Sequence, residues 1–163
     1  MHMVIYALVA ASTEDDALAA GTTVFDGLVG GGVHTKAVFD YYVTFDEEGT
    51  TVAGQTRWGD LPVAAPVDSE DGQALLERGW TATEKAFQRH LERAKEALEE
   101  YDDEAIMRDQ DLVRHTFHQL GAYRGSSIAL YDEHGNGIRH REQLDRRLEA
   151  SGECWIVPAD VHY

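Results

Sequence analysis

The chain has 163 residues, 43% of them hydrophobic, and its 30 acidic against 14 basic side chains give a formal net charge of −16 at pH 7. This length suits one compact domain that buries roughly two thirds of its unfolded surface, so we expect a single globular domain over residues 1–163. No apolar run reaches the roughly 20 residues of a membrane span. The acidic excess also argues against duplex nucleic acid as the partner, because phosphate contacts need a basic face.

The basic side chains are unevenly chosen, since eleven are arginine and only three are lysine. A surface with this acidic excess repels itself in dilute buffer, whereas in molar salt the Debye length falls to about 3 Å and the repulsion is largely screened. The composition therefore predicts adaptation to a salt-rich cytoplasm, with an ordinary acidic protein as the alternative.

Two further features favour a cytoplasmic location. The single cysteine, Cys154, can form no internal disulfide, and the apolar run CWIV around it predicts a buried, inert thiol. The N-terminal run VIYALVAA has no basic leader and is followed by acidic residues, so it indicates a strand rather than a signal peptide.

The first half of the chain predicts a strand, a helix and a hairpin. Met3 to Ala10 is apolar on both alternating faces, which is typical of a strand inside a sheet. A helix is predicted from Glu14 to the glycines at 30–32, because Ser12 and Thr13 can cap it; its buried stripe is Leu18, Val24, Phe25 and Leu28. Residues 39–45 alternate as a strand, 46–49 form a turn, and 50–53 can return as the hairpin partner.

The second half predicts long helices followed by a strand, a helix and a last strand. After a surface connection over 57–72, a long helix is predicted, which Gly79 can bend or divide. Apolar residues that recur at spacings of three and four form its buried stripe: Leu76, Trp80, Thr83, Phe87, Leu91, Ala94, Leu98 and Tyr101. A shorter helical region ends at Gly121. A strand over 127–131, a turn over 132–137, a helix over 141–150 that buries Leu144 and Leu148, and a strand over 154–157 complete the chain.

This order of elements favours an α+β fold. We expect a ferredoxin-like sandwich, with a mostly antiparallel sheet and helices packed on one of its faces. A doubly wound parallel α/β sheet is the alternative.

The best-spaced candidate for chemistry is Asp111, His115 and His118. At 100° per residue these three side chains fall within about 60° of each other, so one carboxylate and two imidazoles could reach a single metal ion. The same projection places them opposite the apolar stripe of their helix, where solvent-facing residues are the simpler interpretation. We expect no cofactor, and a divalent metal ion at these three residues is the alternative.

Two weaker candidates concern anions and partners. The chain has one cluster of basic residues, and it includes Arg139, Arg141 and Arg147. These arginines could bind a phosphate or an acidic partner, although nearby acids can pair with them. The glycines of Gly135-Asn136-Gly137 are explained by turn chemistry. Three aromatic residues are candidates for an interface: Tyr41, Tyr42 and Trp58. Removing water from an aromatic ring is favourable, whereas removing it from a carboxylate is not; core packing is the alternative role of these residues.

Five segments together resemble a family of small, uncharacterised proteins from haloarchaea: FDYYVTFDEEG, RWGDLPVAAPVDSEDG, LVRHTFHQLGAY, IALYDEHGNGIR and WIVPADVHY. The likeness runs over nearly the whole chain. It implies a single domain and a high-salt cytoplasm, and it implies no activity.

Three classes of function stay open. The leading hypothesis is a non-catalytic binding or accessory domain of a halophilic cytoplasm that acts through a protein partner or through self-association as a homodimer. A small metal-dependent enzyme with Asp111, His115 and His118 as ligands is the alternative. A regulator that binds a small anion or nucleotide through Arg139, Arg141 and Arg147 is the third.

Overall fold

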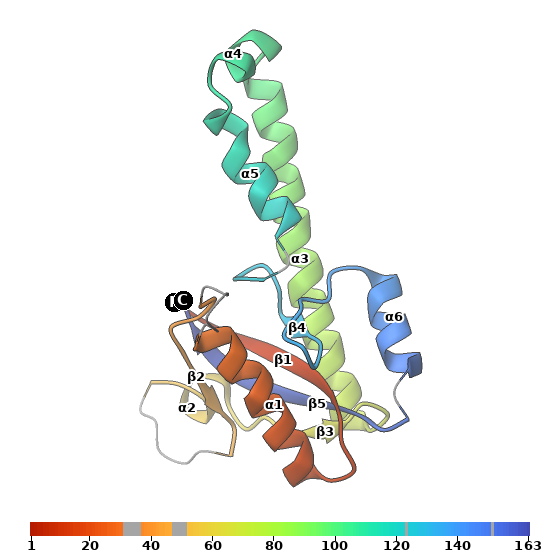
Figure 1. The fold of residues 1–163 in the computed structure, drawn as a ribbon. Coiled ribbons are helices and arrows are strands. Elements are labelled where there is room, and N and C mark those ends of the chain that lie inside the picture. The colour runs from red at the N-terminus through yellow and green to blue at the C-terminus, as the bar shows by residue number, and fades with distance from the viewer. Residues whose placement is uncertain (31–36, 47–51, 123, 151) are drawn as a thin grey trace.

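The structure, a computed structural model, describes residues 1–30, 37–46, 52–122, 124–150 and 152–163. These ranges contain five strands and six helices (Figure 1): β1 (His2–Ala10), α1 (Glu14–Val29), β2 (Tyr41–Thr44), α2 (Gln55–Trp58), β3 (Ala65–Pro66), α3 (Glu70–Glu100), α4 (Asp103–Arg108), α5 (Asp111–Gly121), β4 (Leu130–Tyr131), α6 (Arg141–Ala150) and β5 (Cys154–His162). The α+β class is therefore confirmed. Within these ranges, no helix combines the length and the apolar character that crossing a bilayer requires.

The sheet is mixed. Its order is β2-β5-β1-β4, with β3 also paired to β5. β5 runs antiparallel to β1, β2 and β3, whereas β4 runs parallel to β1. The ferredoxin-like sandwich with a mostly antiparallel sheet is therefore not confirmed. The antiparallel pairing of β1 with β5 along both strands also differs from a doubly wound parallel sheet.

Helices cover both faces of the sheet, so the prediction that they share one face was wrong. In β1, Ile5 and Ala7 belong to the core under α1, while Tyr6 and Leu8 belong to the core under α3 and α6. In Figure 1, α1 lies on one side of the sheet and α3 and α6 lie on the other. A strand with apolar residues on both alternating faces needs a cover on each, which is the physical reason for three layers.

α1 follows the sequence closely. Thr13 caps it by accepting a hydrogen bond from the Asp16 backbone N–H at 3.2 Å, and Gly30 follows its last turn. Of the predicted stripe, three residues are buried and Leu18 is half-buried.

The predicted hairpin after β2 is not formed by the described residues. Residues 47–51 of the expected turn and return strand lie outside them, and Val52 and Ala53 belong to no strand. β2 pairs with β5 instead. β5 extends over nine residues, beyond the predicted 154–157, while β4 is shorter than the predicted 127–131. Cys154 is half-buried at the start of β5.

α3 is one continuous helix of 31 residues that begins at a Ser69 cap. Its first half packs on the sheet, and its second half leaves the sheet and pairs with α5, which runs back antiparallel to it (Figure 1). We call this projection, residues 84–121, the helical arm. Of the predicted stripe, Phe87 is 42% and Leu98 54% exposed, because among the described elements α5 alone packs along this half of α3.

Candidate functional site

One flank of the helical arm is apolar and exposed. Phe87, Leu91 and Leu98 are spaced by four and seven residues, so they lie within about 40° of each other on α3. The buried Ala94 and Ala97, which face α5, lie to one side of this row. α5 therefore covers the row only in part: Phe87 and Leu98 are exposed and Leu91 is half-buried, and the row forms an apolar edge along the arm.

α5 extends the same flank. Because α5 runs opposite to α3, the 100° rotation per residue turns Val113 and Phe117 toward the side that carries Leu91 and Leu98. Phe117 is 43% exposed, and α5 has no fully buried residue. We call these five residues the apolar flank: Phe87, Leu91, Leu98, Val113 and Phe117.

A cavity of about 400 Å³ lies where the arm meets the body of the protein, and we call it the root cavity. It reaches the apolar flank at Phe87, and the segment before α6 closes its other side; its lining is Trp80, Glu84, Phe87, Arg139, His140, Arg141 and Glu142. The Arg141 guanidinium lies over the Trp80 ring at 5.7 Å from its centre. The apolar floor of Trp80 and Phe87 is bordered by two arginines and two glutamates, and Arg141 also pairs with Asp145 at 3.1 Å.

The three arginines predicted to bind an anion are only partly brought together. Arg139 and Arg141 reach the root cavity. Arg139 donates to the backbone carbonyls of Gly121, at 2.9 Å, and Leu120, which end α5. Arg147 turns inward instead, where it pairs with Glu133 and donates to the Leu8 carbonyl at 3.3 Å.

Charge changes sign along the arm. Residues 84–95 carry four basic and two acidic side chains, whereas residues 96–104, at the far end, carry six acidic and no basic ones. The far end consists of the last turns of α3 and the start of α4, and we call it the acidic tip. Most of its carboxylates are exposed to solvent.

Asp111, His115 and His118 lie on the outer side of α5, as the spacing predicted. They line one open hollow together with Arg114, whose guanidinium pairs with Asp111 at 3.2 Å. Across the described ranges, no three His, Cys, Asp or Glu side chains converge so that they could hold a metal ion. A metal role for these three residues stays a prediction from spacing.

His90 lies within the basic stretch of α3, close to Arg89 and Arg93. Partial burial, then the positive charges of Arg93, Arg89 and His115, lower the pKa of His90 below its ordinary value. Its imidazole is therefore biased toward the neutral form by its neighbours.

The aromatic residues predicted for an interface lie on two faces of the sheet. Tyr42 packs on Phe25 of α1, and its hydroxyl donates to Asp26 at 2.7 Å. Tyr41 projects from the opposite face, where its ring stacks on His162 with the centroids 5.2 Å apart. Trp58 of α2 is 40% exposed on that same side.

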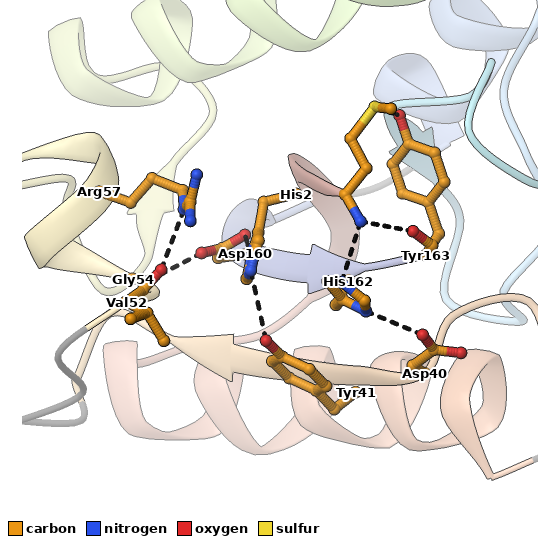
Figure 2. A network of polar contacts seen from close by, with 10 residues as sticks. His2, Asp40, Tyr41, Val52, Gly54, Arg57, Asp160, His162 and Tyr163 are labelled. Carbon is orange, nitrogen blue, oxygen red and sulfur yellow. Dashed lines mark hydrogen bonds and ion pairs between the residues drawn. The ribbon is translucent and has the colours of Figure 1, made fainter.

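A polar network at Tyr41 was missed by sequence reasoning (Figure 2). Its centre is Asp160 of β5, which is fully buried and accepts hydrogen bonds from the His2 ring at 3.0 Å and the Gly54 backbone N–H at 2.9 Å. The second ring nitrogen of His2 lies 3.3 Å from the Tyr41 hydroxyl. Beside them, His162 pairs with Asp40 at 2.8 Å.

Strand register creates this network. β5 places His162 opposite both His2 and Tyr41, and the next row on the same face holds Asp160 between Val4 and Val43. An acid inside the apolar run WIVPADV was the one signal that could have drawn attention to it. By binding Gly54, the residue before α2, Asp160 fixes where α2 and its Trp58 lie.

Comparison with known proteins gives one match. Residues 1–163 match a family described as Domain of unknown function (DUF7995). No curated protein matches the chain. No solved structure matches it either.

Proposed function

For a chain that belongs to the DUF7995 family, a domain of unknown function, we propose a non-catalytic binding domain that self-associates through its helical arm. The observation that carries the proposal is the apolar flank, because two helices that project from a body leave one side of each helix without a cover. Contiguous exposed apolar side chains of this kind mark interaction surfaces.

A second copy is the partner that the flank fits. On α3 the apolar flank is bounded by Phe87 and Leu98, which are eleven positions apart, and Leu91 lies between them on the same side of the helix. Two arms that pack antiparallel about a twofold axis near Glu92 therefore place Phe87 of each copy opposite Leu98 of the other. Such a self-complementary patch is what a twofold interface requires.

Charge supports the same arrangement. In this register the end of α3 in the acidic tip, residues 96–100, lies opposite residues 85–89 of the other copy, which include Lys85 and Arg89 and no acid. The parallel arrangement would instead bring two acidic tips together, and like charges at an interface are unfavourable. Apolar contact supplies the affinity, and charge selects the antiparallel register.

A salt-rich cytoplasm, as in haloarchaea, belongs to this proposal. Each copy carries sixteen net negative charges, so association in dilute buffer works against long-range repulsion. At molar salt this repulsion is screened beyond about 3 Å, while apolar contacts are retained or strengthened.

Sedimentation velocity of the full chain in 2 M KCl tests the proposal. We expect a species of twice the 18.1 kDa chain mass. L98E should give the monomer, because two carboxylates would enter the apolar contact. V52E, which changes a residue that is equally exposed but far from the arm, should remain a dimer. A monomeric wild-type protein would overturn self-association.

The register is tested by cross-linking in a Cys154→Ser background. The pair F87C and L98C should form an intermolecular disulfide, whereas each single substitution should not, because identical positions are far apart in an antiparallel pair. A dimer without this cross-link would reject the arm register and retain self-association through another surface.

A further inference from the structure

A second hollow, independent of the arm flank, lies between α2, β1 and α3. Its volume is about 330 Å³, and its lining is Met3, Val4, Tyr6, Trp58, Leu61, Arg78 and Ala82. We call it the Trp58 groove. Its walls are apolar side chains, and the Arg78 guanidinium is their one charged group. Small-molecule sites in proteins have this composition, with apolar walls and a few polar groups that orient the ligand.

Arg78 has unused binding capacity. In the part of the chain that the structure describes, its guanidinium makes no ion pair and no hydrogen bond, and the side chain is exposed. It lies near the Tyr6 phenol, whose pKa is raised by burial and held down in part by the Arg78 charge. In a chain with sixteen net negative charges, an unpaired arginine beside an apolar hollow is complementary to an anion.

The opposite wall is held in place by the polar network of Figure 2. Gly54 has φ of +60°, a value that favours glycine, and directs its N–H to the buried Asp160. One turn later, the Trp58 N–H donates to the Gly54 carbonyl at 3.0 Å. The Arg57 side chain donates to the Val52 carbonyl at 3.0 Å, which fixes the same segment from outside. The indole is thus preformed as a wall rather than left on a free loop.

We propose that the Trp58 groove binds a small carboxylate with an apolar body. The guanidinium of Arg78 takes the carboxylate in a two-pronged hydrogen bond, and the body lies between the Trp58 indole and the side chains of Val4 and Leu61. The volume suits a body of medium size, at the lower end of ligand sites. This site does not depend on the arm, so it stands or fails separately from self-association.

Isothermal titration calorimetry with octanoate, and with octanol as the neutral match, tests the site. We expect octanoate to bind more tightly than octanol. R78Q should lower the affinity for octanoate by about tenfold or more and leave the affinity for octanol unchanged, because a charge-assisted hydrogen bond is lost only for the anion. R93Q, which removes an equally exposed arginine on the arm, is the matched control and should change neither.

Two further variants keep the result decisive. W58A should lower the affinity for both octanoate and octanol, because the apolar body of each ligand contacts the Trp58 indole. L61W should fill the groove and abolish binding, while circular dichroism verifies that the fold is retained. Equal affinity of octanoate and octanol, or octanoate binding that survives R78Q, overturns the proposal; so does the absence of octanoate binding at millimolar concentration.

Discussion

Gly79 of α3 lies so close to Leu130 of β4 that a Cβ at position 79 would be 2.7 Å from the Leu130 Cδ2 atom and 2.9 Å from a ring carbon of Tyr6. A glycine inside a helical pattern predicts a bend or a division of the helix, whereas α3 continues through Gly79 without a break. The glycine is therefore explained by close approach of the helix to the sheet rather than by helix geometry.

Substituting Gly79 should destabilise the protein. G79A adds helix propensity, but its methyl group overlaps Leu130 and Tyr6, and overpacking of this kind costs about 1–3 kcal/mol. G27A in α1 is the matched control, because nothing lies within 4 Å of a Cβ there, and it should stabilise by up to about 1 kcal/mol. Urea unfolding of both variants measures the change in the free energy of unfolding, which should be a loss for G79A and a gain for G27A. A G79A protein as stable as G27A would contradict this explanation.

Asp160 should contribute to the stability of the fold as well as position α2. D160A leaves the buried Gly54 N–H and the His2 ring without their acceptor, which should cost about 1–3 kcal/mol and lower the melting temperature. D160N retains an oxygen that can accept from Gly54, so its loss should be smaller. A change at Asp40, whose side chain is exposed, should have little effect on thermal melting.

The lowered pKa of His90 predicts that the stability of the fold depends on pH. Its pKa is lowered in the folded state, so the unfolded chain takes up the proton first as pH falls below about 6.5. Stability is therefore full above that pH and declines as pH falls toward the folded pKa. H90Q should reduce this decline in urea titrations between pH 5 and 8. In an NMR titration, R93Q should move the His90 pKa upward, and no movement would reject Arg93 as a cause.

The acidic surface predicts salt dependence of the fold. In millimolar salt the repulsion among the carboxylates is largely unscreened, so the native secondary structure should be incomplete. Its content, measured by circular dichroism, should rise as KCl is raised to the molar range. Full native structure in millimolar salt would remove the salt-adapted interpretation and leave an ordinary acidic protein.

The outer histidines give a test of the metal hypothesis. Asp111 is paired to Arg114, and within the described ranges no further ligand converges on these histidines, so H115A/H118A should change neither the metal content by mass spectrometry nor the sedimentation of the protein. Loss of a stoichiometric metal in this variant would favour the metal-dependent enzyme instead.

Local patterns predicted most of the elements. The Thr13 cap and the first-turn acids placed α1, the three-and-four spacing placed α3, and the apolar run at 154–157 located β5, because each of these signals acts between residues close in sequence. The spacing of Asp111, His115 and His118 likewise predicted their common outer side. What failed was the burial of Phe87 and Leu98, since the same spacing describes a helix whether or not another element covers it.

The chain by itself determined its charge, the two apolar faces of β1 and the period of α3, since these follow from residue type and order. Only the tertiary structure decided the parallel pairing of β4 with β1, the departure of α3 from the sheet, and the meeting of His2, Gly54 and Asp160. Such contacts join residues more than 100 positions apart, and their formation depends on strand register and on which faces remain uncovered, which no local pattern contains.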